Sequence, residues 1–138
     1  MINKILLYSD GGARGNPGPS AIAFIALSEV GEVLTENSRF IGVCTNNQAE
    51  YEALIWALEY ANTVKAQEVT CYLDSELVVK QLNGEYGVKN HKLIPLLNKV
   101  KKICKYFSKI CFLNVRRTNV YIQKADKLVN QTLDEQKG

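Results

Sequence analysis

Short apolar runs separated by turn residues dominate the first third of the chain. Residues 2–9 and 20–27 are apolar and compatible with strands, and residues 33–44 alternate in part between apolar and polar side chains. Asp10-Gly11-Gly12 is a turn signal that is expected to end the first strand, and residues 29–32 resemble a hairpin turn. Three strands joined by short turns predict an antiparallel meander.

Helical periodicity appears in the second third of the chain. Apolar residues recur at helical spacing from Ala49 to Ala61, directly after N-cap candidates at residues 45–47. The elements expected next are a strand, a short helix, a longer helix, a strand and a last helix, at residues 68–73, 76–82, 91–107, 110–115 and 122–133. Hairpins followed by strand–helix alternation predict an α/β fold with a mixed sheet and helices on its faces.

The overall composition adds few constraints. The 138 residues fit one ordinary domain, which we assign to residues 1–138. The net charge is +3 and the pI is 8.6, below the value of about 9 that is typical of dedicated nucleic-acid-binding domains. Charge alone therefore does not indicate a nucleic-acid partner. The chain shows neither a signal-peptide pattern nor an apolar run that could span a membrane, which favours a cytoplasmic protein without membrane contact.

Cysteine and histidine usage argues against zinc. The four cysteines form no C-x-x-C pair, and the chain has one histidine. Neither a structural zinc site nor a secreted disulfide framework is expected from this pattern.

Four acidic residues are placed where they could share a site. Asp10 follows the first expected strand and Asp74 follows the fourth. If these strands are central and parallel, both carboxylates lie at the sheet edge where open α/β sheets bind ligands. Glu50, in the first turn of the long helix, and Asp126, early in the last helix, could point to the same place. Gathered acids repel one another, so hard divalent cations, with Mg²⁺ the usual choice beside phosphates, would be needed to offset them.

Each acid also has a simpler interpretation when it is taken alone. Asp10 and Asp74 could be turn formers or helix caps, and Glu50 could simply favour a helix N-terminus. Asp126 could be a solvated helix residue, and Asp134 is a rival for its role.

Four motifs decide between these interpretations, because they resemble those of type 1 ribonucleases H in the order of that family. They occupy residues 8–19, 45–54, 74–86 and 125–130, and read YSDGGARGNPGP, TNNQAEYEAL, DS followed by NGEY, and ADKLVN. The resemblance spans nearly the whole chain. It implies a ribonuclease H-like α/β fold: a five-stranded mixed sheet, with a meander of the first three strands, parallel fourth and fifth strands, and flanking helices.

The resemblance also implies residue roles. The metal-binding and catalytic carboxylates would be Asp10, Glu50, Asp74 and Asp126. The backbone near Gly11 and the side chains of Asn16, Asn46 and Asn47 would line the minor groove of an RNA/DNA hybrid, where 2′-hydroxyl groups are exposed. Thr45 would belong to a pocket for a phosphate of the DNA strand. Helix capping is the alternative role for Asn46 and Asn47, and the two roles are compatible.

The sequence departs from the family pattern at three places. Residues 114–124 lack the histidine that many members carry before the last carboxylate, and Arg116 and Arg117 stand in that loop instead. Either arginine could approach the scissile phosphate or be a solvated charge. Ile122 stands where relatives often carry asparagine.

The third departure is the short stretch 83–93, which cannot form the basic protrusion of some members, so that the chain resembles the compact archaeal-type or bacterial enzymes. Tyr86 could then contact substrate, with packing over the helix junction as its alternative role. The lysines between residues 99 and 109 form either an electrostatic footprint for nucleic acid or a solvated helix face.

The activity implied by the resemblance is hydrolysis of the RNA strand of RNA/DNA hybrids by a monomeric endonuclease. Two Mg²⁺ ions would act with the substrate, Mn²⁺ is expected to substitute, and the products would carry 5′-phosphate and 3′-hydroxyl ends. Cleavage of double-stranded RNA as well, and a non-catalytic hybrid-binding module, are the alternatives.

Overall fold

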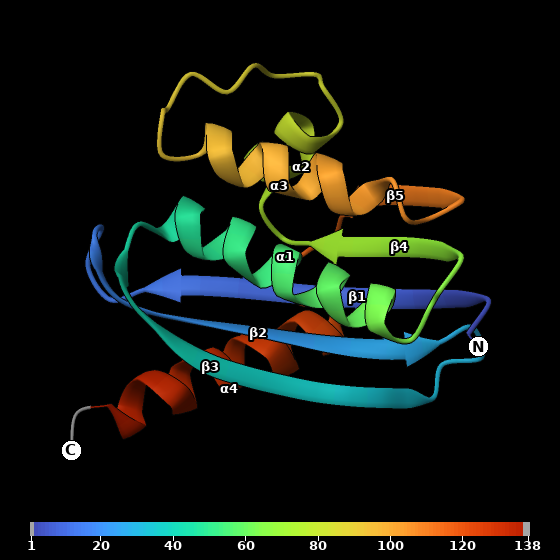
Figure 1. Ribbon diagram of the computed structural model, residues 1–138. Coiled ribbons are helices and arrows are strands. Elements are labelled where there is room, and N and C mark those ends of the chain that lie inside the picture. Colours follow the sequence, from blue (N-terminus) through green and yellow to red (C-terminus); the bar gives the residue numbers. More distant parts are fainter. Residues whose placement is uncertain (1, 137–138) are drawn as a thin grey trace.

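A computed structural model describes residues 2–136, which form a five-stranded sheet and four helices (Figure 1). The strands are β1 Lys4–Ala13, β2 Gly18–Ser28, β3 Val33–Cys44, β4 Glu68–Leu73 and β5 Lys109–Asn114. The helices are α1 Asn46–Thr63, α2 Glu76–Leu82, α3 Ile94–Cys104 and α4 Val120–Glu135. Within residues 2–136, none of the helices has the length and apolarity needed to cross a lipid bilayer.

The sheet has the strand order β3-β2-β1-β4-β5. β1 pairs with β2 and β2 with β3 in antiparallel fashion, whereas β1, β4 and β5 are parallel. The predicted meander and the parallel fourth and fifth strands are therefore confirmed. β1 and β4 are central, as the argument about their carboxylates required.

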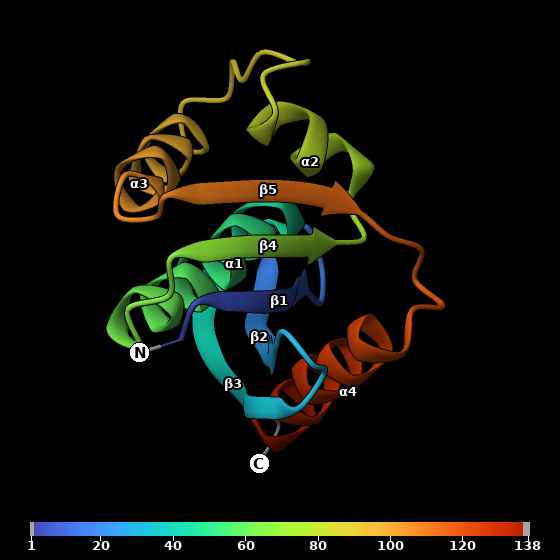
Figure 2. The same ribbon diagram turned by 90° about the vertical axis from the view of Figure 1, so that its right-hand side faces the viewer.

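Helices cover both faces of the sheet (Figure 2). Ile5 and Leu7 of β1 pack with α1, α2 and α3 in one hydrophobic core. Tyr8 of β1 and Ile25 of β2 pack with α4 in a second core on the opposite face. Successive strand residues point to opposite faces of the sheet, and each face lies under one of these cores. β2 is therefore buried on both sides, and its sequence is a nearly continuous apolar run.

β1 is longer than predicted, and the turn expected at Asp10-Gly11-Gly12 is wrong. The strand continues to Ala13 because β2 pairs with it as far as Ala13 and Ser20, whereas the pairing with β4 stops at Tyr8. A Cβ atom on Gly11 would lie 2.2 Å from the carbonyl oxygen of Ala49. Gly11 is thus needed for the close approach of α1 to β1, not for a turn.

The ends of two helices also differ from prediction. α3 begins at Ile94 because residues before it form a turn in which the Asn90 side chain accepts a hydrogen bond from the Lys92 amide at 2.8 Å. α4 begins at Val120 because the Asn119 side chain caps it, accepting from the amides of Tyr121 and Ile122 at 2.9 and 3.1 Å. The predicted bounds of β3, β4 and α2 are confirmed.

Candidate active site

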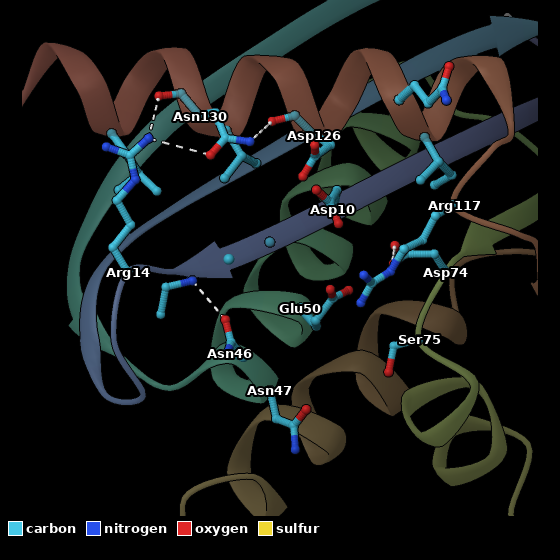
Figure 3. A pocket seen from close by; sticks show the side chains of 17 residues that line it. Asp10, Arg14, Asn46, Asn47, Glu50, Asp74, Ser75, Arg117, Asp126 and Asn130 are labelled. Atoms are coloured by element: carbon cyan, nitrogen blue, oxygen red, sulfur yellow. Dashed lines mark hydrogen bonds and ion pairs between the residues drawn. The ribbon is translucent and has the colours of Figure 1, made fainter.

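Three acidic side chains converge at the carboxyl edge of the central strands (Figure 3). Asp10 extends from β1, Asp74 directly follows β4, and Glu50 comes from α1; one carboxylate oxygen of each lies within 4.8 Å of the others. Glu50 is the fifth residue of α1, so its predicted place in the first turn is wrong by one residue. The alternative that Glu50 serves only to stabilise the helix N-terminus is therefore weakened, because that effect is confined to the first turn.

The fourth acid, Asp126, stands on the other side of the same site. It comes from α4 and lines the same cavity as Asp10, but it lies outside the three-carboxylate cluster. Its rival Asp134 lies two turns further along α4 and forms an ion pair with Arg14 at 2.8 Å. The structure thus brings Asp126, and not Asp134, beside Asp10.

The acids share an unfavourable electrostatic environment. Asp10 is 6% exposed, and burial, followed by the charges of Asp74 and Asp126, raises its pKa to about 8. Burial and the charges of Asp10 and Asp74 raise the pKa of Glu50 well above its usual value, although a hydrogen bond from the Gly11 backbone opposes the shift. Burial also raises the pKa of Asp74, while Arg117 lowers it. These protein groups do not fully compensate the charge that they gather.

One carboxylate oxygen of the cluster, Glu50 Oε2, is buried without a hydrogen-bond partner within residues 2–136. A buried carboxylate oxygen without a partner is costly, and a divalent cation with oxygen ligands would satisfy it and the neighbouring acids together. The donor set, which consists of carboxylates only, suits Mg²⁺ or Mn²⁺ better than zinc or copper.

The cluster opens into a cavity of about 510 Å³ with a mostly polar lining. Asn46 and Asn47 line one side, Arg14 and Asn130 line the other, and Gly11 also lines the cavity. Amide donors and acceptors therefore surround the acids, which suits a substrate with hydroxyl and phosphate groups.

The expected groove-binding asparagines connect two segments. The Asn46 side chain accepts a hydrogen bond from the Ala13 amide at 2.9 Å, and the Asn46 amide donates to the Asn16 side chain at 3.0 Å. These bonds tie the end of β1 and the β1–β2 loop to the beginning of α1. Asn47 lines the cavity.

Thr45 is the N-cap of α1. Its hydroxyl accepts from the Gln48 amide at 3.2 Å, and the Gln48 side chain accepts from the Thr45 amide at 2.9 Å. This is a capping box, which the spacing Thr-x-x-Gln could have predicted. The alternative that Asn46 or Asn47 provides the cap is wrong.

Of the other residues expected at the site, Arg117 lines the cavity, whereas Arg116 and Tyr86 do not. Arg117 lines the cavity, and its Nε is 3.7 Å from Asp74 Oδ2. Arg116 is exposed and does not line the cavity. Tyr86 is 49% exposed in the α2–α3 loop, with Lys80 Nζ 5.1 Å from its ring centroid, and is not among the residues around the acids.

Sequence reasoning missed a polar link across the cavity rim. Besides its ion pair with Asp134, Arg14 donates to the backbone and side-chain oxygens of Asn130 at 3.3 and 3.4 Å. The Asn130 side chain in turn donates to the backbone oxygen of Asp126 at 3.0 Å. Both residues occur in the recognised motifs, but no local pattern pairs them.

Comparisons with known proteins agree on one family. The model of the reverse transcriptase-like family matches residues 8–132. A protein of Halobacterium salinarum named ribonuclease HI is 37% identical over 96% of this chain and 65% of its own length. Bifunctional protein Rv2228c of Mycobacterium tuberculosis is 38% identical over 95% of this chain, which spans 36% of that relative.

Solved structures are similar over nearly the whole chain. The structure of RNase H1 from Halobacterium salinarum superimposes with a TM-score of 0.92 at 35% identity, covering 96% of this chain and 99% of that one. The structure of LC11-RNase H1 in complex with an RNA/DNA hybrid gives a TM-score of 0.91 at 40% identity, covering 97% and 99%.

Proposed function

The chain belongs to the type 1 ribonuclease H family, and on this premise we propose that it is a metal-dependent endonuclease that hydrolyses the RNA strand of RNA/DNA hybrids. The observation that carries the proposal is the convergence of Asp10, Glu50 and Asp74 within 4.8 Å, with Asp126 beside them. We propose further that residues 1–138 act as one ribonuclease H domain. The similar LC11 enzyme was crystallised with a hybrid, which supports this substrate class.

The four carboxylates are proposed to hold two Mg²⁺ ions together with the substrate, and Mn²⁺ is expected to substitute. When bound, such ions supply the activation of water and the stabilisation of the departing 3′-oxygen, which leaves 5′-phosphate and 3′-hydroxyl ends. The unpartnered Glu50 oxygen and the raised pKa values of Asp10, Glu50 and Asp74 support a cation at this position.

The surrounding residues position the substrate. The Asn16 side chain accepts a hydrogen bond from the Asn46 backbone amide, and the Asn46 side chain accepts one from the Ala13 amide. Held in this way, both would present amide groups to the minor groove near Gly11 and Asn47. We propose this role for them and a phosphate contact near Thr45. Binding by Tyr86 would require the duplex to reach the α2–α3 loop.

Arg117 is proposed to assist at the scissile phosphate. Its guanidinium lies near Asp74 yet is 90% exposed, so it can turn toward a bound anion. Arg116 lies outside the cavity, and the structure offers less support for its assistance. A cytoplasmic location and a monomeric state remain predictions.

A strand-labelled cleavage assay tests the proposal. We would compare an RNA/DNA hybrid, double-stranded RNA, single-stranded RNA and double-stranded DNA in Mg²⁺, in Mn²⁺ and in EDTA. Cleavage of the RNA of the hybrid, only with metal, is the expected result. Additional cleavage of double-stranded RNA would widen the substrate class, because both duplexes share groove shape. Hybrid binding without cleavage in either metal would contradict the proposal and favour a binding module.

A further inference from the structure

Basic and acidic residues are unevenly distributed along the chain. Residues 86–125 contain ten basic residues and no acidic one, whereas the remaining positions contain seven basic and fourteen acidic residues. The small net charge of +3 therefore conceals a strongly basic segment within an otherwise acidic protein. This segment begins in the α2–α3 loop and includes α3, β5 and the start of α4.

The lysines of α3 and its C-terminal end form one exposed surface. We call this surface the α3 basic face; it consists of Lys99, Lys101, Lys102, Lys105 and Tyr106. Its four lysines are exposed, and none forms an ion pair with a carboxylate of residues 2–136. Tyr106 is 70% exposed and lies one turn after Lys102. The opposite side of the helix is apolar and packs on α1.

Helix stability does not account for this arrangement. Lys99 and Lys102, and likewise Lys101 and Lys105, are three and four residues apart, a spacing at which like charges repel. The helix contains no acid that would compensate them. The helix dipole favours cations in the last turn, but it gains nothing from their mutual repulsion.

The N-terminal end of α3 lies near the start of α1, which lines the candidate active site. α1 and α3 lie side by side and run in the same direction (Figure 1). At their N-terminal ends, Lys92 and Leu96 share a groove with Gln48 of α1, which follows Asn46 and Asn47 directly. The eleven residues of α3 extend about 16 Å from there, a distance of roughly five phosphates along one strand of a duplex.

From this geometry we propose that the α3 basic face is a second contact for the sugar–phosphate backbone of a nucleic-acid duplex, outside the catalytic cavity. The lysines would neutralise phosphates without reading sequence, and Tyr106 would offer its ring to a sugar or an unpaired base. The inference rests on the proposed function for the identity of the partner, because the duplex would be the hybrid whose RNA is cut at the acids.

Duplex length and salt dependence test the proposal. We would measure Kd by fluorescence anisotropy in EDTA for hybrids of about 10 and about 30 base pairs, at several salt concentrations. The variant Lys99→Gln/Lys102→Gln should raise Kd for the long hybrid about tenfold at low salt, and lower the slope of log Kd against log salt by about 2. Its effect on the short hybrid should be small. Because like charges are removed, Tm should not fall.

A matched control separates this surface from net charge. Lys4→Gln/Lys65→Gln removes the same charge from the start of β1 and the α1–β4 connection, and should leave Kd and slope unchanged. Equal effects of both variants, or no effect of Lys99→Gln/Lys102→Gln on the long hybrid, would overturn the proposal. Binding of wild-type protein to phosphatidylserine vesicles but not to the long hybrid would also overturn it.

Cleavage is measured separately, so that the two proposals can fail independently. With Mg²⁺, the Lys99→Gln/Lys102→Gln variant should keep kcat and show a raised KM for the long hybrid. The wild-type protein could cut no hybrid and still bind long hybrids with a salt dependence that falls when Lys99 and Lys102 are replaced. This result would contradict the proposed activity and support the α3 basic face as a binding surface.

Discussion

Replacing Asp10 by asparagine should stabilise the metal-free protein at alkaline pH while removing its activity. The pKa of Asp10 is about 8 in the folded state and 3.8 in the unfolded reference. The folded state therefore binds this proton more tightly. The stabilisation from the proton is complete below about pH 4 and is lost as pH rises through about 8.

The size of the effect follows from this difference. A shift of about 4 units corresponds to at most about 6 kcal/mol of unfolding free energy at alkaline pH. Relaxation and water penetration would leave about 2–4 kcal/mol. Asparagine has nearly the same shape and no charge, so the Asp10→Asn variant should be more stable than wild type by this amount near pH 8 and about equal to it near pH 4.

Urea unfolding in EDTA at several pH values measures the difference directly. Glu29→Gln is the matched control, because it removes a carboxylate from the exposed β2–β3 turn. Mg²⁺ should then stabilise wild type far more than the Asp10→Asn variant. A variant that is no more stable than wild type near pH 8 in EDTA would refute the argument that burial and repulsion strain these carboxylates.

Three further substitutions test separate parts of the site. Asp74→Asn should abolish cleavage in Mg²⁺ with an unchanged circular dichroism spectrum; cleavage at the wild-type rate would remove Asp74 from the mechanism. Gly11→Ala should destabilise by about 3 kcal/mol or more in urea unfolding, because its Cβ would lie 2.2 Å from the Ala49 oxygen; a loss below about 1 kcal/mol would show that α1 can shift. Arg117→Ala should lower kcat moderately, about tenfold, in steady-state cleavage, and an unchanged kcat would leave the arginine as a solvated charge.

Much of the fold was predictable because its cause is local. The partial alternation of β3, the apolar run of β4 and the helical periodicity of α1 are visible in short windows of sequence. The convergence of Asp10 and Asp74 followed from strand–helix–strand connectivity, which places the ends of parallel strands at one edge.

Two features that the prediction missed have causes that no short window contains, whereas the start of α3 has a local cause. β1 continues through Gly11 because β2 pairs with it and α1 needs the space, and both partners are distant in sequence. The bonds of Arg14 to Asn130 span 116 residues, so neither residue has a local signal for its role. The start of α3 depended on the Asn90 side chain, which competes with the helix for a backbone amide.

The position of Asp126 has a consequence for how the protein is made. Three of the acids lie within the first 74 residues, but the fourth arrives on α4, which packs on the other face of the sheet. A chain that grows from its N-terminus can pair β1 with β4 long before α4 leaves the ribosome. Until then, Arg14 lacks its partners on α4, and the face of the sheet beneath that helix is uncovered. If all four acids are needed, the site is complete only after α4 has packed on the sheet.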